Sequence, residues 1–412
     1  MKKIFAFILV VCFVIALSAC TAGTVKPAEP TAPVVSGDVD ETAEIIPIKI
    51  GFIFLHDEQS TYDLNFITSA KEACEETNVQ YIFKTNIPEG QECYEAACEL
   101  ADEGCSIVFA DSFGHEDYMI QAAKIYPDVQ FCHATGTQAH TIGLSNFHNA
   151  FASIYEGRYL AGVAAGLKLN EMIANEEFAP EEATVGYIGA YPYAEVISGY
   201  TSFFLGIRSV CPTATMAVTY TNSWYDQTLE QEAAHYFASH NFKLISQHAD
   251  SMGAPLECEN NNIPNVSYNG STVDACPNTF MVSSRINWTP YFIYIINCIK
   301  NNEPIDTDWT GTVETGSVEL TSFNDNVCAL ETAETVNAIR EKLASGEIHV
   351  FDTNSFTVNG EVLSEYMADV DSDPNYEADT QVVQNGYFHE SEYRSAPYFD
   401  IIIDGITILS GT

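Results

Sequence analysis

The segment SQHADSMG (residues 246–253) carries residues whose types and spacing could do chemistry. His248 and Asp250 are two positions apart after an apolar run, so in an extended chain their side chains point to the same side. Such a pair could act as a general acid and base, or could hold a ligand by hydrogen bonds. No Ser or Cys is visibly partnered with the pair, and the sequence has neither a G-x-S-x-G elbow nor a G-x-x-x-x-G-K phosphate loop. We therefore expect binding instead of catalysis.

The pattern Ala-Asp-Ser-x-Gly occurs twice, first as ADSFG at residues 110–114. Gly51, in the apolar run KIGFIFL, precedes Ala110 by 59 positions (110 − 51), and Gly186, in TVGYIGAY, precedes Ala249 by 63 (249 − 186). The two motifs thus lie at matching points of two β-α-β-α-β units, which indicates a duplicated architecture. Because ligands of open parallel sheets bind beyond the carboxyl ends of the strands, we expect both motifs to face one cleft.

The alternation of apolar runs and helical periodicity predicts a doubly wound α/β fold. Predicted strands cover residues 48–57, 79–86, 106–114, 129–136, 184–191, 215–224 and 242–253. Predicted helices cover residues 62–77, 89–103, 115–126, 150–169, 194–210, 227–239 and 331–344. The last part of the chain has strand-like stretches at 347–363 and 398–409.

Composition limits the partners of this chain. Its 412 residues suffice for two ordinary domains, and 46% of them are hydrophobic. A formal charge of −41 argues against nucleic acid, which needs a basic surface, and disfavours a free anionic ligand.

The N-terminus has the pattern of an export signal. Lys2 and Lys3 precede an apolar run over residues 4–17, and LSAC at 17–20 looks like a bacterial lipobox that ends at Cys20. We expect a signal peptide at 1–19, lipidation of Cys20 and a disordered tether at 20–46, which would hold the protein on the outer face of the cell membrane. An ordinary secretory signal with an unrelated Cys is the alternative.

The cysteines and acidic residues do not predict a metal site or any cofactor. Ten cysteines follow Cys20 without a C-x-x-C pair or a histidine at zinc spacing, so we expect few or no disulfides, Cys258 with Cys276 being the best candidate. The run DVDSDPNYEAD (369–379) lacks the central Gly and terminal Glu of a calcium loop and is interpreted as a solvated loop.

Several long stretches carry a family resemblance, among them TVGYIGAYPYAEVISGYTSFFLGIR, NSWYDQTLEQEAAHYFASHNFKLISQHADS, YEGRYLAGVAAGLK, YPDVQFCHATG and RINWTPYFI. From about residue 48 to 406 the chain resembles the bacterial basic-membrane-protein family, lipoprotein solute-binding proteins of ABC transporters that include purine nucleoside receptors. The resemblance implies a periplasmic-binding-protein type I fold, in which two α/β lobes joined by a hinge close around a small solute. It divides the chain into lobe 1 (47–150 plus about 289–325) and lobe 2 (151–288 plus about 326–412).

Carried over by position, the resemblance implies a set of ligand-binding residues. Tyr62, in the loop HDEQSTYDLNF, matches the aromatic residue that stacks on the solute, while Ser60 stands where relatives have Trp, which implies an altered pocket wall. The full set is Tyr62, Asp63, Ser112, Phe113, Glu195, Trp224, Asp226, His248, Asp250, Ser251, Asn269 and Trp288. Structural roles are the alternatives: hinge packing for the two tryptophans, a helix cap for Asp250 and a helix-dipole partner for Glu195.

The set suits a purine nucleoside or a related heteroaromatic solute, since flat rings stack on aromatic side chains and carboxylates accept hydrogen bonds from ring N–H groups or hydroxyls. No Lys or Arg cluster accompanies it, which argues against a phosphate on the ligand. The resemblance implies an ABC permease and ATPase as partners, and a monomer. A ligand-sensing lipoprotein, and a sugar or other polar small molecule as ligand, are the alternatives.

Overall fold

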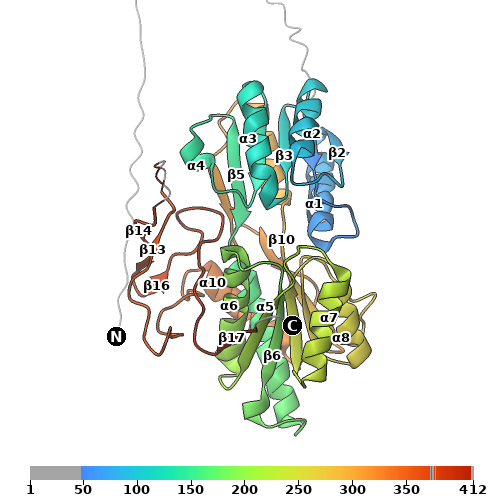
Figure 1. Cartoon of the computed structure of the whole chain (residues 1–412), viewed down its shortest axis with the longest axis vertical. Helices are drawn as coiled ribbons and strands as arrows, with labels where there is room; N and C mark the ends of the chain where they lie inside the picture. Colours follow the sequence, from blue (N-terminus) through green and yellow to red (C-terminus); the bar gives the residue numbers. More distant parts are fainter. Residues whose placement is uncertain (1–47, 372, 374, 376, 410–412) are drawn as a thin grey trace, which may run out of the picture. The chain divides into compact units, whose positions relative to one another are not determined.

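The computed structural model describes residues 48–371, 373, 375 and 377–409, so the expected signal peptide, Cys20 and the whole of the expected tether lie outside the described residues. Two large sheets, each with helices on both faces, make up two lobes (Figure 1). Within the described residues, no helix combines the length and hydropathy that crossing a membrane requires.

The first lobe has a six-stranded, all-parallel sheet of order β11-β5-β4-β3-β1-β2. Its strands are β1 (Lys49–Ile53), β2 (Gln80–Lys84), β3 (Ile107–Ala110), β4 (Gln130–Ala134), β5 (Phe147–Ala152) and β11 (Asp308–Gly311). Its helices are α1 (Thr61–Thr77), α2 (Gln91–Asp102), the 3-10 turn η1 (Phe113–His115), α3 (Glu116–Ile125), α4 (Ala139–Ile142) and α9 (Thr289–Asn301).

The second lobe has a seven-stranded sheet of order β12-β10-β9-β8-β6-β7-β17, in which β12 alone runs antiparallel. Its strands are β6 (Thr184–Gly189), β7 (Thr215–Tyr220), β8 (Leu244–His248), β9 (Asn265–Tyr268), β10 (Phe280–Ile286), β12 (Val318–Leu320) and β17 (Ile406–Ile408). Its helices are α5 (Ile154–Ala174), the 3-10 turn η2 (Pro180–Glu182), α6 (Ala194–Val210), α7 (Gln227–Ser239), α8 (Gly253–Asn261) and α10 (Thr332–Ala344).

The two sheets share one strand order, which confirms the duplicated architecture. The order β2-β1-β3-β4-β5 of the first sheet is matched by β7-β6-β8-β9-β10 in the second. In register, Ile53 at the end of β1 pairs with Ala110, and Gly189 at the end of β6 pairs with His248. Both Ala-Asp-Ser-x-Gly motifs therefore begin at the carboxyl edge of the third strand of their unit, as the spacing predicted.

Some predicted elements differ from the structure. The helix expected at 150–169 starts only at Ile154, because residues 147–152 form strand β5, buried at every position. A short run of small and aromatic residues buried on both faces has no periodicity that separates a strand from a helix. The stretch 347–363 has no strand; it turns instead, with Asp352 and Asn354 in a side-chain-capped turn.

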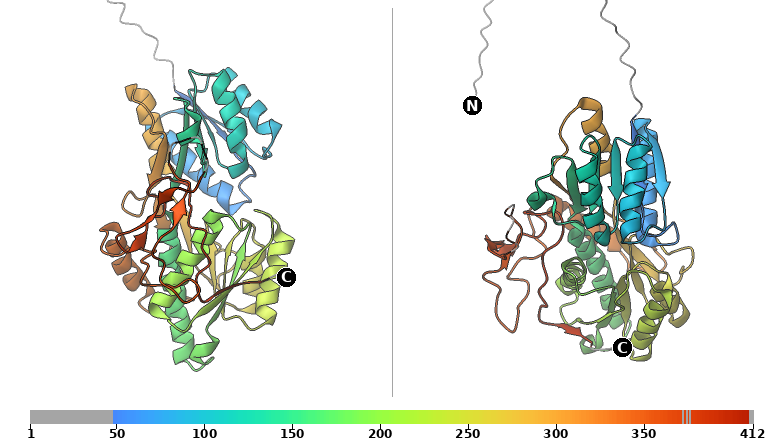
Figure 2. Two further views of the ribbon diagram at one scale, coloured as in Figure 1. Left: turned by 60° about the vertical axis from the view of Figure 1, so that its left-hand side comes forward. Right: turned by 45° about the horizontal axis from the view of Figure 1, so that its top comes forward.

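The segment after α10 (residues 345–409, the C-terminal segment) lies along the second lobe and reaches the first (Figure 2). It includes the short strands β13 (Met367–Ala368), β14 (Thr380–Gln381), β15 (Val383–Gln384) and β16 (Tyr387–Phe388). Its last strand, β17, extends the second sheet at β7. The lobe boundaries expected near residues 150, 288 and 325 stay predictions; strand pairing puts all of β5 in the first sheet and β12 in the second.

The ten cysteines from Cys74 to Cys328 are free thiols, including the candidate pair Cys258 and Cys276. Burial raises the pKa of the Cys258 thiol far above its ordinary value. A buried protonated thiol packs as a small hydrophobic group and reacts slowly.

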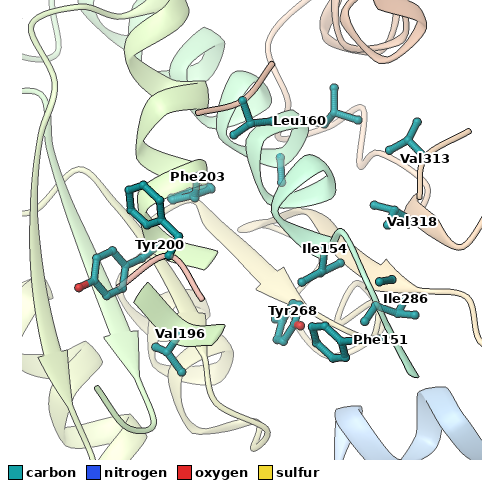
Figure 3. Packing of buried hydrophobic residues seen from close by; sticks show 14 of the residues in the cluster. Phe151, Ile154, Leu160, Val196, Tyr200, Phe203, Tyr268, Ile286, Val313 and Val318 are labelled. Atoms are coloured by element: carbon teal, nitrogen blue, oxygen red, sulfur yellow. The ribbon is translucent and has the colours of Figure 1, made fainter. Parts of the chain in front are cut away.

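Helices α5 and α6 pack closely on one face of the second sheet (Figure 3). A Cβ atom added at Gly162 would lie 2.0 Å from the carbonyl oxygen of Phe203, and one added at Gly206 would lie 2.1 Å from that of Tyr159. The glycines thus let the two backbones touch. This contact fixes α6, whose first turn carries Glu195, against α5.

Buried polar contacts join helix α7 to the second Ala-Asp-Ser-x-Gly motif, residues 249–253. Asp226 caps α7 by accepting the N–H groups of residues 228 and 229, as its side chain oxygen lies 3.0 Å from each. Glu230, fully buried, accepts the N–H of Ser251 at 3.3 Å and that of Asp226 at 3.2 Å. Gly253 comes so close to α7 that an added Cβ would lie 2.3 Å from the carbonyl oxygen of Gln227. The loop that carries Asp250 is therefore fixed from α7.

We predict that Gly162→Ala lowers the free energy of unfolding by about 1–3 kcal/mol, because the added methyl group forces α5 and α6 apart. Urea unfolding followed by circular dichroism measures the change. Glu95→Ala, on the exposed side of α2, is the control and should stay within about 0.5 kcal/mol of wild type. Equal effects of the two substitutions would contradict the close packing.

A second prediction concerns pH. Burial raises the pKa of Glu230 from about 4.5 to about 7, although hydrogen bonds from Ser251 and Asp226 act against burial. Since the folded protein holds this proton more tightly than the unfolded chain, the stabilising contribution is complete below about pH 4.5 and is lost as the pH rises through about 7.

Glu230→Gln should therefore flatten the decline in the free energy of unfolding between about pH 4.5 and 7, by up to about 3 kcal/mol. Urea titrations at several pH values measure the slope for wild type and variant. Glu95→Gln, which neutralises an exposed carboxylate, is the matched control. If the free energy of unfolding varies with pH in the same way in wild type and in Glu230→Gln, Glu230 is not the buried group that holds the proton.

Candidate functional site

A cavity that is partly open to solvent lies between the carboxyl edges of the two sheets. The cavity is lined from the first lobe by Leu55, His56, Tyr62, Ser112, Phe113 and Thr135, and from the second by Glu195, Trp224, His248, Asp250 and Tyr268. The repeated motifs thus contribute to the same cavity from opposite sides.

The structure brings most of the predicted residues together at this cavity. Those that line it are Tyr62, Ser112, Phe113, Glu195, Trp224, His248 and Asp250. The hydroxyl of Ser112 donates to Glu89 and does not cap the turn that follows. Phe113, 45% exposed, lies 5.8 Å from Tyr193 of the second lobe, measured between ring centroids, so this aromatic pair reaches across the cleft.

Trp288 and Asn269 do not line the cavity. Trp288 is 1% exposed and stacks on Phe66 at 4.5 Å between ring centroids, in the core between α1 and α9, because its large apolar ring gains most by full burial. Asn269 is buried beyond the end of β9 with a positive φ of 64°. These two positions correct the expected pocket lining.

Three further predicted residues, and Ser60, hold the loops around the cavity. Asp63 accepts the N–H of His56 at 2.7 Å, and Ser60 caps α1 by accepting the N–H of Asp63 at 3.2 Å. Asp226 caps α7, and Ser251 accepts the N–H of Gly253 at 3.1 Å. None of the four side chains is among the residues that line the cavity.

The first two residues of α1 join the two motifs. The Thr61 N–H donates to the carbonyl oxygen of Asp250 at 3.2 Å, across the cleft. The Tyr62 hydroxyl donates to the carbonyl oxygen of Asp111, in the other motif, at 2.7 Å. One helix start therefore contacts the corresponding residue of both units, and the ring of Tyr62 is held facing the cavity.

The side-chain carboxyl groups of Asp111 and Asp250, the acidic residues of the two motifs, point in different directions. Asp111 accepts the N–H of Leu55 at 3.1 Å within its own lobe, whereas the side chain of Asp250 faces the cavity. Burial, together with neighbouring carboxylates, raises the pKa of both groups well above the ordinary value. A carboxyl group in this state can accept hydrogen bonds and, while it keeps its proton, donate one.

His248 and Glu195 form a polar pair on the second side of the cavity. His248 Nε2 lies 3.4 Å from Glu195 Oε1, and its ring lies 4.4 Å from that of Tyr268. Burial lowers the pKa of His248, and the nearby charge of Arg158 lowers it further, although Glu195 acts in the opposite direction. The histidine therefore offers a neutral imidazole to the cavity.

Arg158, fully buried on α5, lies behind this wall. It donates to the carbonyl oxygen of Gln247 at 3.1 Å and to the hydroxyl of Tyr187, and its guanidinium lies 4.8 Å from the ring centroid of Tyr268. Burial lowers its pKa to about 10, so it stays charged at neutral pH. This cation partly offsets the carboxyl groups around the cavity.

The lining residues missed from the sequence are Leu55, His56, Thr135 and Tyr268. Each lies at or just beyond the carboxyl end of a parallel strand: β1 for the first two, β4 for Thr135 and β9 for Tyr268. The rule that identified the two motifs would have found them if it had been applied to every predicted strand.

The acidic run at 369–379 places carboxylate oxygens of three exposed residues within 4.8 Å of one another: Asp371, Asp373 and Asp379. Exposed acidic groups often lie this close without an ion.

Known proteins resemble this chain over most of its length. The model of the Bmp family, described as PnrA-like substrate-binding proteins of ABC transporters, matches residues 53–354. A purine-binding protein of Brucella abortus (strain 2308) is 31% identical over 313 residues, which cover 74% of this chain and 83% of that protein. A Haloferax volcanii protein named as an ABC transporter glucose-binding protein is 29% identical over 259 residues, 63% of this chain and 62% of that protein.

A solved structure supports the fold. The solute-binding protein of an ABC transporter system from Aeropyrum pernix K1 superposes with a TM-score of 0.61 at 15% identity, covering 74% of this chain and 93% of that one. This likeness confirms the periplasmic-binding-protein type of α/β fold. Family and fold are those of solute-binding proteins, which work outside the cytoplasm with a small-molecule ligand and transporter partners. The chain belongs to the Bmp family of PnrA-like ABC transporter substrate-binding proteins.

Proposed function

We propose that this protein binds a purine nucleoside or a related small heteroaromatic solute in the cavity between its lobes and passes it to an ABC permease. The observation that carries the proposal is the combination, in one cavity, of the Tyr62 ring and the Asp250 carboxyl group from opposite lobes. The purine-binding protein of Brucella abortus, 31% identical to this chain, supports the same ligand class.

The chemistry of the cavity suits such a solute. Stacking of a base on an aromatic side chain contributes about 1–3 kcal/mol in other recognition systems, and Tyr62, Phe113, Trp224 and Tyr268 offer such rings here. Carboxyl oxygens of Asp250 and Glu195 accept hydrogen bonds from hydroxyl or ring N–H groups. Among the described lining residues there is no Lys or Arg, so the cavity favours a ligand without phosphate.

A ligand that contacts both lobes stabilises the closed state, which is how binding signals to a partner. A lipid anchor would keep such a protein close to its permease. We propose that Cys20 carries the lipid anchor and that the following residues tether a monomeric binding protein to the outer face of the membrane, as the sequence pattern indicates.

The first test is a ligand screen by isothermal titration calorimetry with purified protein. We expect purine nucleosides or bases to bind with micromolar or lower dissociation constants, and glucose and amino acids to show no heat of binding. Glucose is included because of the named function of the Haloferax volcanii relative. Binding of glucose without binding of nucleosides would overturn the proposed ligand class while leaving the fold as described.

The second test is specific to the cavity. Asp250→Asn, which keeps the shape of the side chain but removes its acid group, should weaken nucleoside binding about tenfold, and Tyr62→Ala should weaken it by about fivefold to a hundredfold. Asp226→Asn is the matched control, because Asn caps a helix as well as Asp and the residue does not line the cavity. Unchanged affinity in both cavity variants, with melting temperatures near wild type, would place the ligand elsewhere.

A further inference from the structure

The C-terminal segment forms one wall of the entrance to the site, beyond the residues that match the family model. That match ends at residue 354. Further on, the Ser395 N–H donates to Asp308 Oδ2 of the first lobe at 2.7 Å, and the Tyr155 hydroxyl of the second lobe donates to the carbonyl oxygen of Glu390 at 3.2 Å. Because the segment contacts both lobes, it has a fixed place beside the cleft.

An entrance cavity of about 810 Å³, open to solvent, lies between this wall and the two lobes. It shares lining residues with the inner cavity: Phe113, Thr135, Glu195 and Trp224. The C-terminal segment adds Arg394, Ala396, Pro397 and Asp400. A ligand whose ring fills the inner cavity can therefore extend into the entrance cavity past Glu195.

The entrance cavity presents one cation and two carboxylates. Arg394 is half-buried and donates through Nη1 to the carbonyl oxygen of Asp369 at 3.0 Å, which orients its guanidinium. For its Nη2 group no acceptor is found among the described residues. Asp400 accepts the hydroxyl of Tyr366 through Oδ1. Arg394, Glu195 and Asp400 thus line the same space.

The charged groups of the entrance cavity favour some ligand substituents over others. A phosphate would meet two carboxylates for a single guanidinium, and an apolar substituent would displace water from the charged groups without replacing its hydrogen bonds. A substituent that carries both a carboxylate and an ammonium group matches the set, because the first pairs with Arg394 and the second with the two acids.

We propose that the entrance cavity is a subsite for an amino-acid-like, zwitterionic substituent on a nucleoside, its carboxylate bound by Arg394 and its ammonium group by Glu195 and Asp400. The proposal rests on the proposed function, since the nucleoside ring occupies the inner cavity.

The test compares two ligands that differ only in this substituent. S-adenosylhomocysteine and 5′-methylthioadenosine share the adenosine and the thioether, but the second lacks the amino-acid end. We expect full-length protein to bind S-adenosylhomocysteine about tenfold more tightly in calorimetry, as charge-assisted hydrogen bonds predict. Arg394→Gln should bring the ratio of the two affinities close to one, while Arg340→Gln, an equal change of charge at an exposed position of α10, should leave the ratio as in wild type.

The outcomes separate the two proposals. A ratio near one in the wild-type protein, with both compounds bound, overturns the subsite and leaves the proposed function standing, as does an unchanged ratio in Arg394→Gln. If neither compound nor any nucleoside binds, both proposals fall. Binding of S-adenosylhomocysteine alone supports the subsite and shows that the substituent is required for affinity.

Discussion

The start of helix α1 is the contact on which the rest of the site depends. A helix leaves its first N–H groups without partners inside the helix, and here the Thr61 N–H reaches across to the carbonyl oxygen of Asp250 while the Tyr62 hydroxyl bonds the carbonyl oxygen of Asp111. These two carbonyls occupy the same place in the two repeated motifs. The Thr61 bond joins the first lobe to the second, whereas the Tyr62 bond stays within the first, so the same helix start connects the backbones of both motifs. Ser60 supports the arrangement by capping the same helix.

The second constraint is electrostatic. Buried carboxyl groups are costly to ionise, and the motif acids Asp111 and Asp250 respond with raised pKa values. Arg158 stands on the far side of the His248 wall and supplies positive charge without entering the cavity. The cavity therefore contains many hydrogen-bond acceptors and few cations. Such a lining favours ligands that carry hydroxyl and amino groups and disfavours ligands that carry a phosphate. This is the local counterpart of the chain's formal charge of −41.

Much of the fold followed from the sequence because helix periodicity and repeat spacing are local signals. Helices α6 and α7 begin and end where the pattern predicted, and the two motifs lie at the same edge. Strand β5 was missed because a run buried on both faces carries no period. Trp288 was expected in the cavity from the family resemblance alone. It follows a strand as Asp250 does, but position at a strand edge does not reveal which way a side chain turns, and the ring of Trp288 completes the core. Tyr268 was missed because the edge rule was applied to the conspicuous motifs alone.

The C-terminal segment adds one wall to the entrance of the binding cleft. Strand β17 pairs with β7 at the edge of the second sheet, and Ser395 bonds to Asp308 on β11, the edge strand of the first. The edge strand β7 offers unpaired backbone groups to β17, and Asp308 offers its side-chain carboxylate to Ser395, so the added stretch of chain joins both lobes without disturbing the order of the sheets. Residues between these two attachments, including Asp400, are therefore placed by the sheets rather than by a free loop. That placement is what makes charged groups at the entrance useful for recognition, since a side chain held in position loses less entropy when it binds.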